Sequence, residues 1–279
     1  MTKGHEITLG GTPIKREDFQ WDMMLNFSQN MRYFHQIDPE YSVDALYVRK
    51  GLRADYIAYS DWEWSPDGQL VIGDDGLPVS AQYKDQVIGY TAPKWFWGFS
   101  NQFRYKDFSF SLSIDGRIKG MSYSTTNDYL WNTGAHVDSD TQYRYDEVVN
   151  GKQTFIAPGV KITSGSVTYD DYGRITEDTR TFAPNDQTVS YETYYRNASG
   201  GRWNYWDETF IKLRELSLNY RVPEKFASKL RAKRASVGIT GQNLLLWSKE
   251  YRFSDPDRGK EDLNSPSMRY IGFNLNLTF

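Results

Sequence analysis

The sequence of 279 residues contains no cysteine, which excludes a disulfide framework and any zinc site built on thiolates. It has no run of about 18 apolar residues, and this excludes a transmembrane helix. A net charge of −3 gives no reason to expect a nucleic-acid partner. The opening residues, MTKGHEITLGG, lack the apolar core of a signal peptide. The chain must therefore be held together by non-covalent packing alone.

The sequence also lacks the arrangements that catalysis and metal binding require. Its three histidines, His5, His35 and His136, lie far apart, and neither a nucleophile elbow nor a phosphate-binding loop occurs. Two aspartate-rich stretches, Gly73–Gly76 (GDDG) and Ser254–Asp257 (SDPD), offer the oxygen ligands that calcium prefers. Neither has the spacing of a calcium loop, and Asp-Gly and Asp-Pro are common in turns. We predict no enzymatic activity, no cofactor and no metal site.

Aromatic residues, by contrast, make up 16% of the chain, and apolar and polar residues alternate over long stretches. In the stretch FSFSLSIDGRIKG, serine and charged residues alternate with an apolar set: Phe108, Phe110, Leu112, Ile114 and Ile118. The stretch WFWGFSNQFRYK before it alternates in the same way. At the end of the chain the alternating apolar residues are Ile271, Phe273, Leu275 and Leu277. A period of two residues predicts β-strands.

Four weaker stretches share this period and bring the total to about seven strands: His5–Leu9, Phe19–Gln29, Thr209–Val222 and Ala235–Leu245. We expect an all-β, antiparallel fold with a tight hairpin at Lys106–Asp107. Pro223 is expected to open a helical turn in the connection that follows it. Short and long connections alternate along the chain. All long connections should therefore lie at one end of the sheet and all short ones at the other.

Alternation by itself fits two settings, a soluble sandwich around a core and an outer-membrane barrel around a wet interior. Strands of about eleven residues, long loops at one end only, and Tyr and Trp near strand ends favour the membrane barrel. A soluble or surface β-sandwich that binds carbohydrate remains the alternative.

The order and spacing of four blocks in the last third of the chain resemble the end of SusC/RagA-type TonB-dependent transporters. The blocks are DETFIKLRELSLNYRVPEKF (Asp207–Phe226), SVGITGQNLLLW (Ser236–Trp247), SDPD (Ser254–Asp257) and the terminal RYIGFNLNLTF (Arg269–Phe279). Two upstream stretches, WDMMLNFSQN (Trp21–Asn30) and APKWFWGFSNQFRYKDFSFSL (Ala92–Leu112), resemble the same family. The resemblance extends through essentially the whole chain.

This resemblance implies a place in the outer membrane of a Gram-negative bacterium and the import of glycans or other oligomeric nutrients. Residues 1–279 would form the C-terminal part of a 22-stranded barrel with short periplasmic turns and long extracellular loops. The implied partners are outer-membrane lipid, a SusD-like surface lipoprotein, the TonB complex, and a glycan or peptide substrate.

The family also has a signal peptide, a TonB-engaging segment and a plug domain, and this sequence shows none of them. Seven strands would moreover leave the first and last running in the same direction, so an antiparallel barrel could not close. An unclosed sheet in lipid leaves backbone groups unpaired. We therefore expect the chain alone to be non-functional as a transporter.

The lipid-facing residues are expected to be the alternating apolar set: Phe108, Phe110, Leu112, Ile114, Ile118, Ile271, Phe273, Leu275 and Leu277. Phe279 resembles the terminal aromatic residue that the outer-membrane insertion machinery reads. Trp62, Trp64 and Trp131 lie in the long connections, where they could contact substrate or a lid protein, since Tyr and Trp are enriched at interfaces. Packing of these loops on themselves explains the same tryptophans equally well.

Overall fold

A computed structural model describes residues 1–43, 45–82, 86–198, 201–258, 261–263 and 267–279. The chain divides into two compact units. The sheet unit comprises Met1–Arg32, Ala92–Met121 and Asp207–Phe279, and the loop unit comprises Tyr33–Thr91 and Ser122–Trp206. In the part of the chain that is described, no helix has both the length and the apolar composition needed to span a bilayer.

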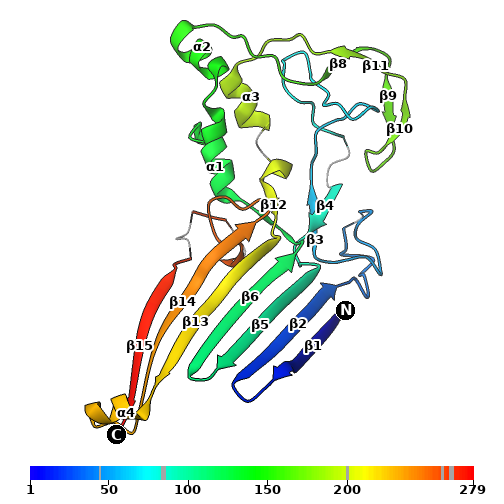
Figure 1. Cartoon of the computed structure of the whole chain (residues 1–279). Helices are drawn as coiled ribbons and strands as arrows, with labels where there is room; N and C mark the ends of the chain where they lie inside the picture. The colour runs from blue at the N-terminus through cyan, green and yellow to red at the C-terminus, as the bar shows by residue number, and fades with distance from the viewer. Residues whose placement is uncertain (44, 83–85, 199–200, 259–260, 264–266) are drawn as a thin grey trace. The chain divides into compact units, whose positions relative to one another are not determined.

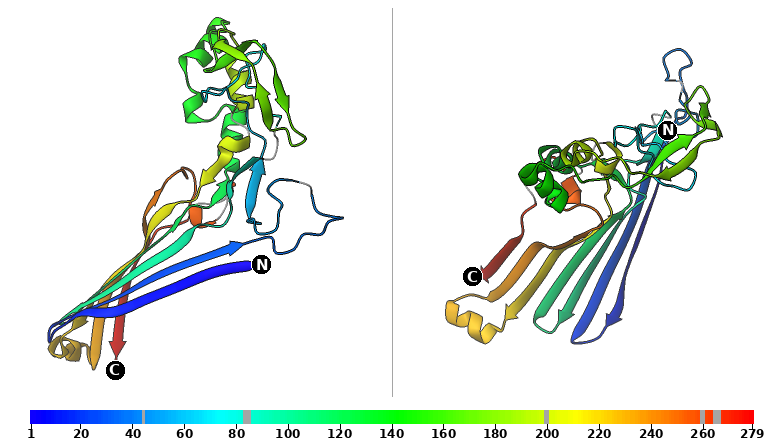
Figure 2. Two further views of the ribbon diagram at one scale, coloured as in Figure 1. Left: turned by 90° about the vertical axis from the view of Figure 1, so that its right-hand side faces the viewer. Right: turned by 90° about the horizontal axis from the view of Figure 1, so that it is seen from above.

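The sheet unit contains one seven-stranded antiparallel sheet in which every strand pairs with its neighbour in chain order (Figure 1). Its strands are β1 (Thr2–Lys15), β2 (Phe19–Arg32), β5 (Trp95–Tyr105), β6 (Phe108–Ile118), β13 (Phe210–Val222), β14 (Arg234–Ser248) and β15 (Tyr270–Thr278). The strands form a single layer with β1 and β15 at its two edges (Figure 2). The seven predicted antiparallel strands are confirmed, and three of them, β1, β2 and β14, are longer than the alternation indicated.

Short and long connections alternate as predicted. The short ones are residues 16–18, 106–107 and 223–233, and the long ones are residues 33–94, 119–209 and 249–269. The hairpin at Lys106–Asp107 is present, with Lys106 at a φ of 50°. The helical turn after Pro223 is also present, as α4 (Glu224–Ala227) followed by η3 (Ser228–Leu230). All three long connections therefore leave the sheet at the same end.

The register places the predicted lipid-facing residues on one side of the sheet. Phe110 lies opposite Leu218 of β13, which lies opposite Ile239 of β14, which in turn lies opposite Phe273 of β15. Directly opposed residues in a sheet share a face, so one apolar face runs across these strands. Phe273 on the edge strand is 84% exposed. The shared face is thus a finding, whereas contact of these residues with lipid stays a prediction.

A β-bulge on β13 keeps the apolar and polar residues on separate faces at the point where the strict alternation of the sequence is interrupted. On β13 the register shifts between Leu213 and Glu215, which inserts Arg214 relative to β6. Upstream of the shift the odd-numbered Ile211 and Leu213 lie on the apolar face, and downstream of it the even-numbered Leu216 does so. A bulge adds one residue without moving the rest of the strand to the wrong face.

Gly116 on the apolar face allows a close approach between neighbouring strands. A Cβ atom there would lie 2.3 Å from the Phe210 carbonyl oxygen and 2.9 Å from the Trp97 indole ring. Both contacts are shorter than van der Waals separation, and the carbonyl belongs to the backbone of the next strand. The indole of Trp97 therefore covers this glycine, which has no side chain of its own to pack.

The Gly116→Ala substitution should lower the free energy of unfolding by about 1–3 kcal/mol, because the added methyl group overpacks this contact. The matched control is Gly98→Ala, where the nearest atom is the Asp115 Cβ at 4.0 Å and the change should stay within about 0.5 kcal/mol. Urea unfolding of the protein in lipid vesicles measures both changes. Equal transition midpoints for the two variants would contradict the close contact at Gly116.

The loop unit contains short elements only. Its strands pair two by two, β3 (Tyr56–Tyr59) with β4 (Gln86–Tyr90), β8 (Val160–Ser164) with β11 (Thr181–Pro184), and β9 (Val167–Tyr169) with β10 (Ile175–Asp178). Its helical segments are α1 (Thr125–Thr133), η1 (Val137–Ser139), α2 (Gln142–Asn150), α3 (Tyr191–Ala198) and η2 (Gly201–Asn204). A further strand pair, β7 (Met121–Tyr123) and β12 (Tyr205–Asp207), lies where the chain passes from one unit to the other, and η4 (Pro256–Arg258) belongs to the sheet unit.

Candidate functional site

The polar face of the sheet carries a cluster of charges near the end where the long connections leave. Asp115 and Arg117 occupy alternate positions on β6, and Lys212 and Arg214 do so on β13. Spacing by two residues points both members of each pair to the same side of the sheet. The register then sets Lys212 directly opposite Asp115. Two strands thus bring cations and carboxylates together although they are about 100 residues apart in sequence.

The connection between β14 and β15, residues 249–269, supplies the remaining carboxylates, and we call it the SDPD loop. Lys212 Nζ donates to Asp255 Oδ2 and, at 2.9 Å, to Asp257 Oδ2. The Ser267 hydroxyl also donates to Asp255. Lys212 and Asp255 are each 2% exposed. A buried charge is tolerated when it is paired and hydrogen-bonded, and this pair satisfies both conditions.

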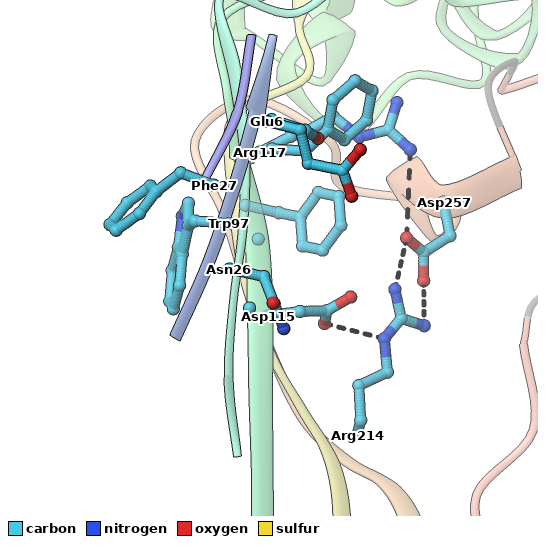
Figure 3. Close-up of a pocket in the computed structure, with 13 residues that line it drawn as sticks. Glu6, Asn26, Phe27, Trp97, Asp115, Arg117, Arg214 and Asp257 are labelled. Carbon is cyan, nitrogen blue, oxygen red and sulfur yellow. Dashed lines mark hydrogen bonds and ion pairs between the residues drawn. The ribbon is translucent and has the colours of Figure 1, made fainter. Parts of the chain in front are cut away.

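Arg214 connects the sheet to the same loop (Figure 3). Its Nε donates to Asp115 Oδ1 at 2.7 Å, and its Nη2 donates to Asp257 Oδ1 at 2.7 Å. Burial alone would raise the pKa of Asp257, but the hydrogen bonds and charges of Arg214 and Lys212 outweigh it and lower that pKa. The carboxylate therefore stays ionised and holds both cations.

Arg117 also belongs to the charge cluster. Its Nη1 donates to Glu208 Oε2 at 2.7 Å, and its Nη2 lies 3.8 Å from Asp257 Oδ1. The guanidinium also lies between two aromatic rings, 5.7 Å from the Phe96 centroid and 5.2 Å from the Phe210 centroid. Cation–π attraction and the ion pair with Glu208 fix this side chain in one place.

A second ion-pair group holds the beginning of the SDPD loop. Asp207 accepts hydrogen bonds from Lys249 Nζ at 2.7 Å and from Lys119 Nζ at 3.2 Å. Burial would raise the pKa of Asp207, but the bonds from Lys249, Thr209 and Lys119 lower it to about 2. This carboxylate is therefore ionised at neutral pH and links three segments of the sheet unit.

Glu261 shapes the SDPD loop from within. Its side chain is fully buried, and Oε1 accepts the backbone N–H groups of Phe253 and Ser254 at 2.8 Å each. These bonds direct the chain into η4, where the Asp257 N–H donates to Asp255 Oδ1 at 3.0 Å. A buried carboxylate of the loop itself thus fixes the backbone at Phe253 and Ser254, in addition to the carboxylates that contact the sheet.

A pocket of about 300 Å³ lies beside the charge cluster. Its lining includes Arg117, Arg214 and Asp257 from the cluster, and Glu6 and Asn26 from β1 and β2 (Figure 3). The lining offers guanidinium donors, carboxylate and amide acceptors, and aromatic rings. Such a set can hydrogen-bond a polar molecule and stack against its apolar parts.

Predicted contact residues in the long connections pack within the loop unit. The ring of Trp131 stacks on His136 with centroids 4.3 Å apart and lies 6.0 Å from the ring of Tyr195. Trp62 and Trp64 are half-buried and form isolated bridges with Ser80 and Leu70. All three tryptophans thus belong to the loop unit, and their contact with substrate or a lid protein stays a prediction.

The two aspartate-rich stretches play different roles. In GDDG, the Leu77 N–H donates to Asp75 Oδ1 at 3.0 Å and Gly76 has a φ of 77°, so this stretch is a turn as expected. SDPD also forms a turn as expected, since the Arg258 N–H donates to the Asp255 carbonyl at 3.0 Å, but its carboxylates bind side-chain cations as well. Within the described residues, no group of three or more His, Asp or Glu side chains is placed to hold a metal ion.

Sequence reasoning assigned Asp115, Arg117 and Lys119 to the polar face but missed the cluster that β6 and β13 form with the SDPD loop. The sequence contains only a weak indication of this cluster. Lys212 and Arg214 flank Leu213 on β13, and two cations at alternate positions of one strand favour anions nearby.

Comparison with known proteins supports the architecture. No family model matches the chain. It is 21% identical over 301 residues to TonB-dependent receptor P3 of Formosa agariphila, and 23% identical over 319 residues to TonB-dependent receptor P26 of the same organism. These alignments cover 97% and 99% of this chain but only 26% and 29% of the relatives.

Solved structures of a peptide importer share the fold. The RagAB peptide transporter matches all of this chain and 29% of its own with a TM-score of 0.59 and 17% identity. The RagAB importer in its closed-closed state also matches the whole chain and 29% of its own, with a TM-score of 0.60 and 16% identity. The chain thus spans less than a third of these proteins.

The comparisons point to one class of protein: over its whole length the chain is similar in sequence to TonB-dependent receptors and shares its fold with the RagAB transporter. Within that class the chain is a relative of the SusC/RagA-type TonB-dependent receptors, as the four sequence blocks predicted. These relatives are receptors and transporters rather than enzymes, which agrees with the predicted lack of catalysis.

Proposed function

We propose that the chain forms the C-terminal part of the barrel wall of a TonB-dependent importer in the outer membrane of a Gram-negative bacterium. The observation that carries the proposal is the single-layered sheet with one apolar and one polar face. In this proposal the apolar face contacts lipid and the polar face lines a wet interior. Strands of 9 to 15 residues suffice to cross the hydrocarbon layer.

The two edges of the sheet also support a larger barrel. β1 and β15 each have one hydrogen-bonded neighbour in the sheet, and both run in the same direction. An antiparallel barrel closes only with an even number of strands, so this seven-stranded sheet needs an odd number of further strands. A 22-stranded barrel satisfies this condition. Unpaired backbone groups at an edge cost several kcal/mol each in lipid, so we propose that the chain does not transport by itself.

The orientation follows from the connections. The long connections, including the SDPD loop, lie on the extracellular side, and the three short ones lie on the periplasmic side. A SusD-like lipoprotein then covers the extracellular mouth, and the TonB complex drives import. The pocket beside Arg117 faces the interior, where it contacts a polar oligomer, either a glycan or a peptide.

A soluble carbohydrate-binding sandwich fits the structure less well. A sandwich covers the apolar face of one sheet with a second sheet about 10 Å away. The described part of the sheet unit contains one sheet, and Ile271, Phe273 and Leu275 are exposed on it.

Membrane fractionation tests the proposed function. The protein, expressed from its native gene, should be recovered in the outer-membrane fraction and should remain there after washing with alkaline carbonate. Recovery in the soluble fraction without detergent would contradict the membrane wall and favour the sandwich.

A further inference from the structure

The short connection between β13 and β14 is strongly basic, and together with Arg234, the first residue of β14, we call it the basic turn (residues 223–234). It carries five cations against the single acidic residue Glu224: Lys225, Lys229, Arg231, Lys233 and Arg234. All five are exposed. The other two short connections, residues 16–18 and 106–107, contain as many acidic as basic residues or more. The positive charge is therefore specific to this turn rather than common to that end of the sheet.

Small buried residues hold the basic turn in a compact shape (Figure 1). Ala227 and Ala232 are 0% and 5% exposed, and the Ala232 N–H donates to the Ala227 carbonyl at 3.2 Å. Arg231, with a φ of 58°, reverses the chain after η3. Because the alanines take the inside of the turn, the long side chains project outward.

An aromatic ring projects outward together with the cations. Phe226 is 54% exposed, and the Lys229 ammonium lies 5.7 Å from its ring centroid. A large exposed apolar side chain next to cations is typical of segments that lie in a membrane interface. There the ring enters the acyl boundary while the cations stay at the level of the phosphates.

The position of the basic turn between two long strands also agrees with a place in the membrane interface. It joins the ends of two strands whose apolar-face residues Val222 and Val237 lie close to the turn. If these strands cross the hydrocarbon layer, the turn leaves it at the headgroup level. Two interactions involve the turn itself: Lys233 Nζ donates to the Phe279 carbonyl at 3.2 Å, and the acidic Glu224 begins α4.

We propose that the basic turn binds the headgroups of anionic phospholipids in the leaflet at the short-turn end of the barrel. This inference rests on the proposed function, because it requires β13 and β14 to cross the bilayer. Lys225, Lys229 and Arg231 contact the lipid phosphates, and Phe226 inserts beside the acyl chains. Polybasic segments at a membrane surface gain affinity for anionic lipid with each cation.

The test uses phosphatidylglycerol as the anionic probe and phosphatidylcholine as the neutral one, with native mass spectrometry of the native protein extracted in detergent. The triple variant Lys225→Gln, Lys229→Gln, Arg231→Gln should weaken phosphatidylglycerol binding at least about ten-fold and leave phosphatidylcholine binding unchanged. The charge-preserving variant Lys225→Arg, Lys229→Arg should bind like the wild type. If the triple variant does not reach the membrane, Lys229→Gln alone should still weaken binding by about five-fold.

A matched control removes the same charge from the loop unit, by Lys50→Gln, Lys152→Gln and Arg196→Gln, all exposed. It should change phosphatidylglycerol binding by less than about two-fold, because it leaves every cation of the basic turn in place. If both triple variants bound phosphatidylglycerol equally well, the proposed lipid site would be wrong. The proposed place of the sheet in the membrane would be unaffected. A wild-type protein that carbonate washes from the membrane would overturn the proposed function and this inference with it.

Discussion

Replacing Lys212 by methionine should lower the free energy of unfolding by about 3–5 kcal/mol. The substitution keeps most of the side-chain volume but removes the cation paired with the buried Asp255, whereas Asp257 keeps its ion pair with Arg214. Losing one partner of a buried ion pair leaves an uncompensated charge, and this dominates the cost. Urea unfolding of the membrane-embedded protein measures the change.

The SDPD loop should also become accessible in Lys212→Met. Trypsin can cleave after Arg252 and Arg258, which lie in this loop, and cleavage there reports its release from the sheet. The control is Lys161→Met, which breaks an ion pair with Asp186 whose side chains are 39% and 70% exposed. Such pairs contribute about 0–1 kcal/mol, so this variant should unfold nearly like the wild type.

Removing both charges separates the ion pair from the packing around it. The double variant Lys212→Met, Asp255→Leu should recover a large part of the lost stability, because an apolar pair of similar volume needs no counter-charge. If Lys212→Met and Lys161→Met unfolded at the same urea concentration, the buried cluster would not hold the SDPD loop as described.

An arginine at Leu112 should lower the stability of the membrane-embedded protein by about 2–4 kcal/mol, the cost of placing this cation on a lipid face near the bilayer midplane. Leu112 lies in the middle of β6, opposite Leu216 of β13 and Asn101 of β5, and neither neighbour carries a charge. The folded fraction in lipid vesicles as a function of urea measures this cost.

Ser113→Arg is the matched control, because the next residue along β6 points to the opposite face. Ser113 lies directly opposite Glu215 of β13, so an arginine there gains a carboxylate neighbour across the strands. We expect assembly close to that of the wild type. Equal damage from both arginines would show that the apolar face does not contact lipid.

Sequence alone determined the strands of the seven-stranded sheet, the hairpin at Lys106–Asp107 and the membership of the apolar face, but not the short strands of the long connections. These features follow from a period of two residues and from local turn chemistry, both of which can be read within a dozen neighbouring residues. The alternation could not locate the bulge at Arg214, because the sequence shows only that the phase of the pattern changes.

The charge cluster was decided by the tertiary structure. Asp115, Lys212 and Asp255 come from three separate segments, and their meeting depends on the register between β6 and β13 and on the path of the SDPD loop. In the sequence, each of these residues is simply a charged residue in a strand or a turn. Side-chain alternation is a local property of the chain, whereas the pairing of distant charges depends on how the segments pack, and only the folded sheet sets that.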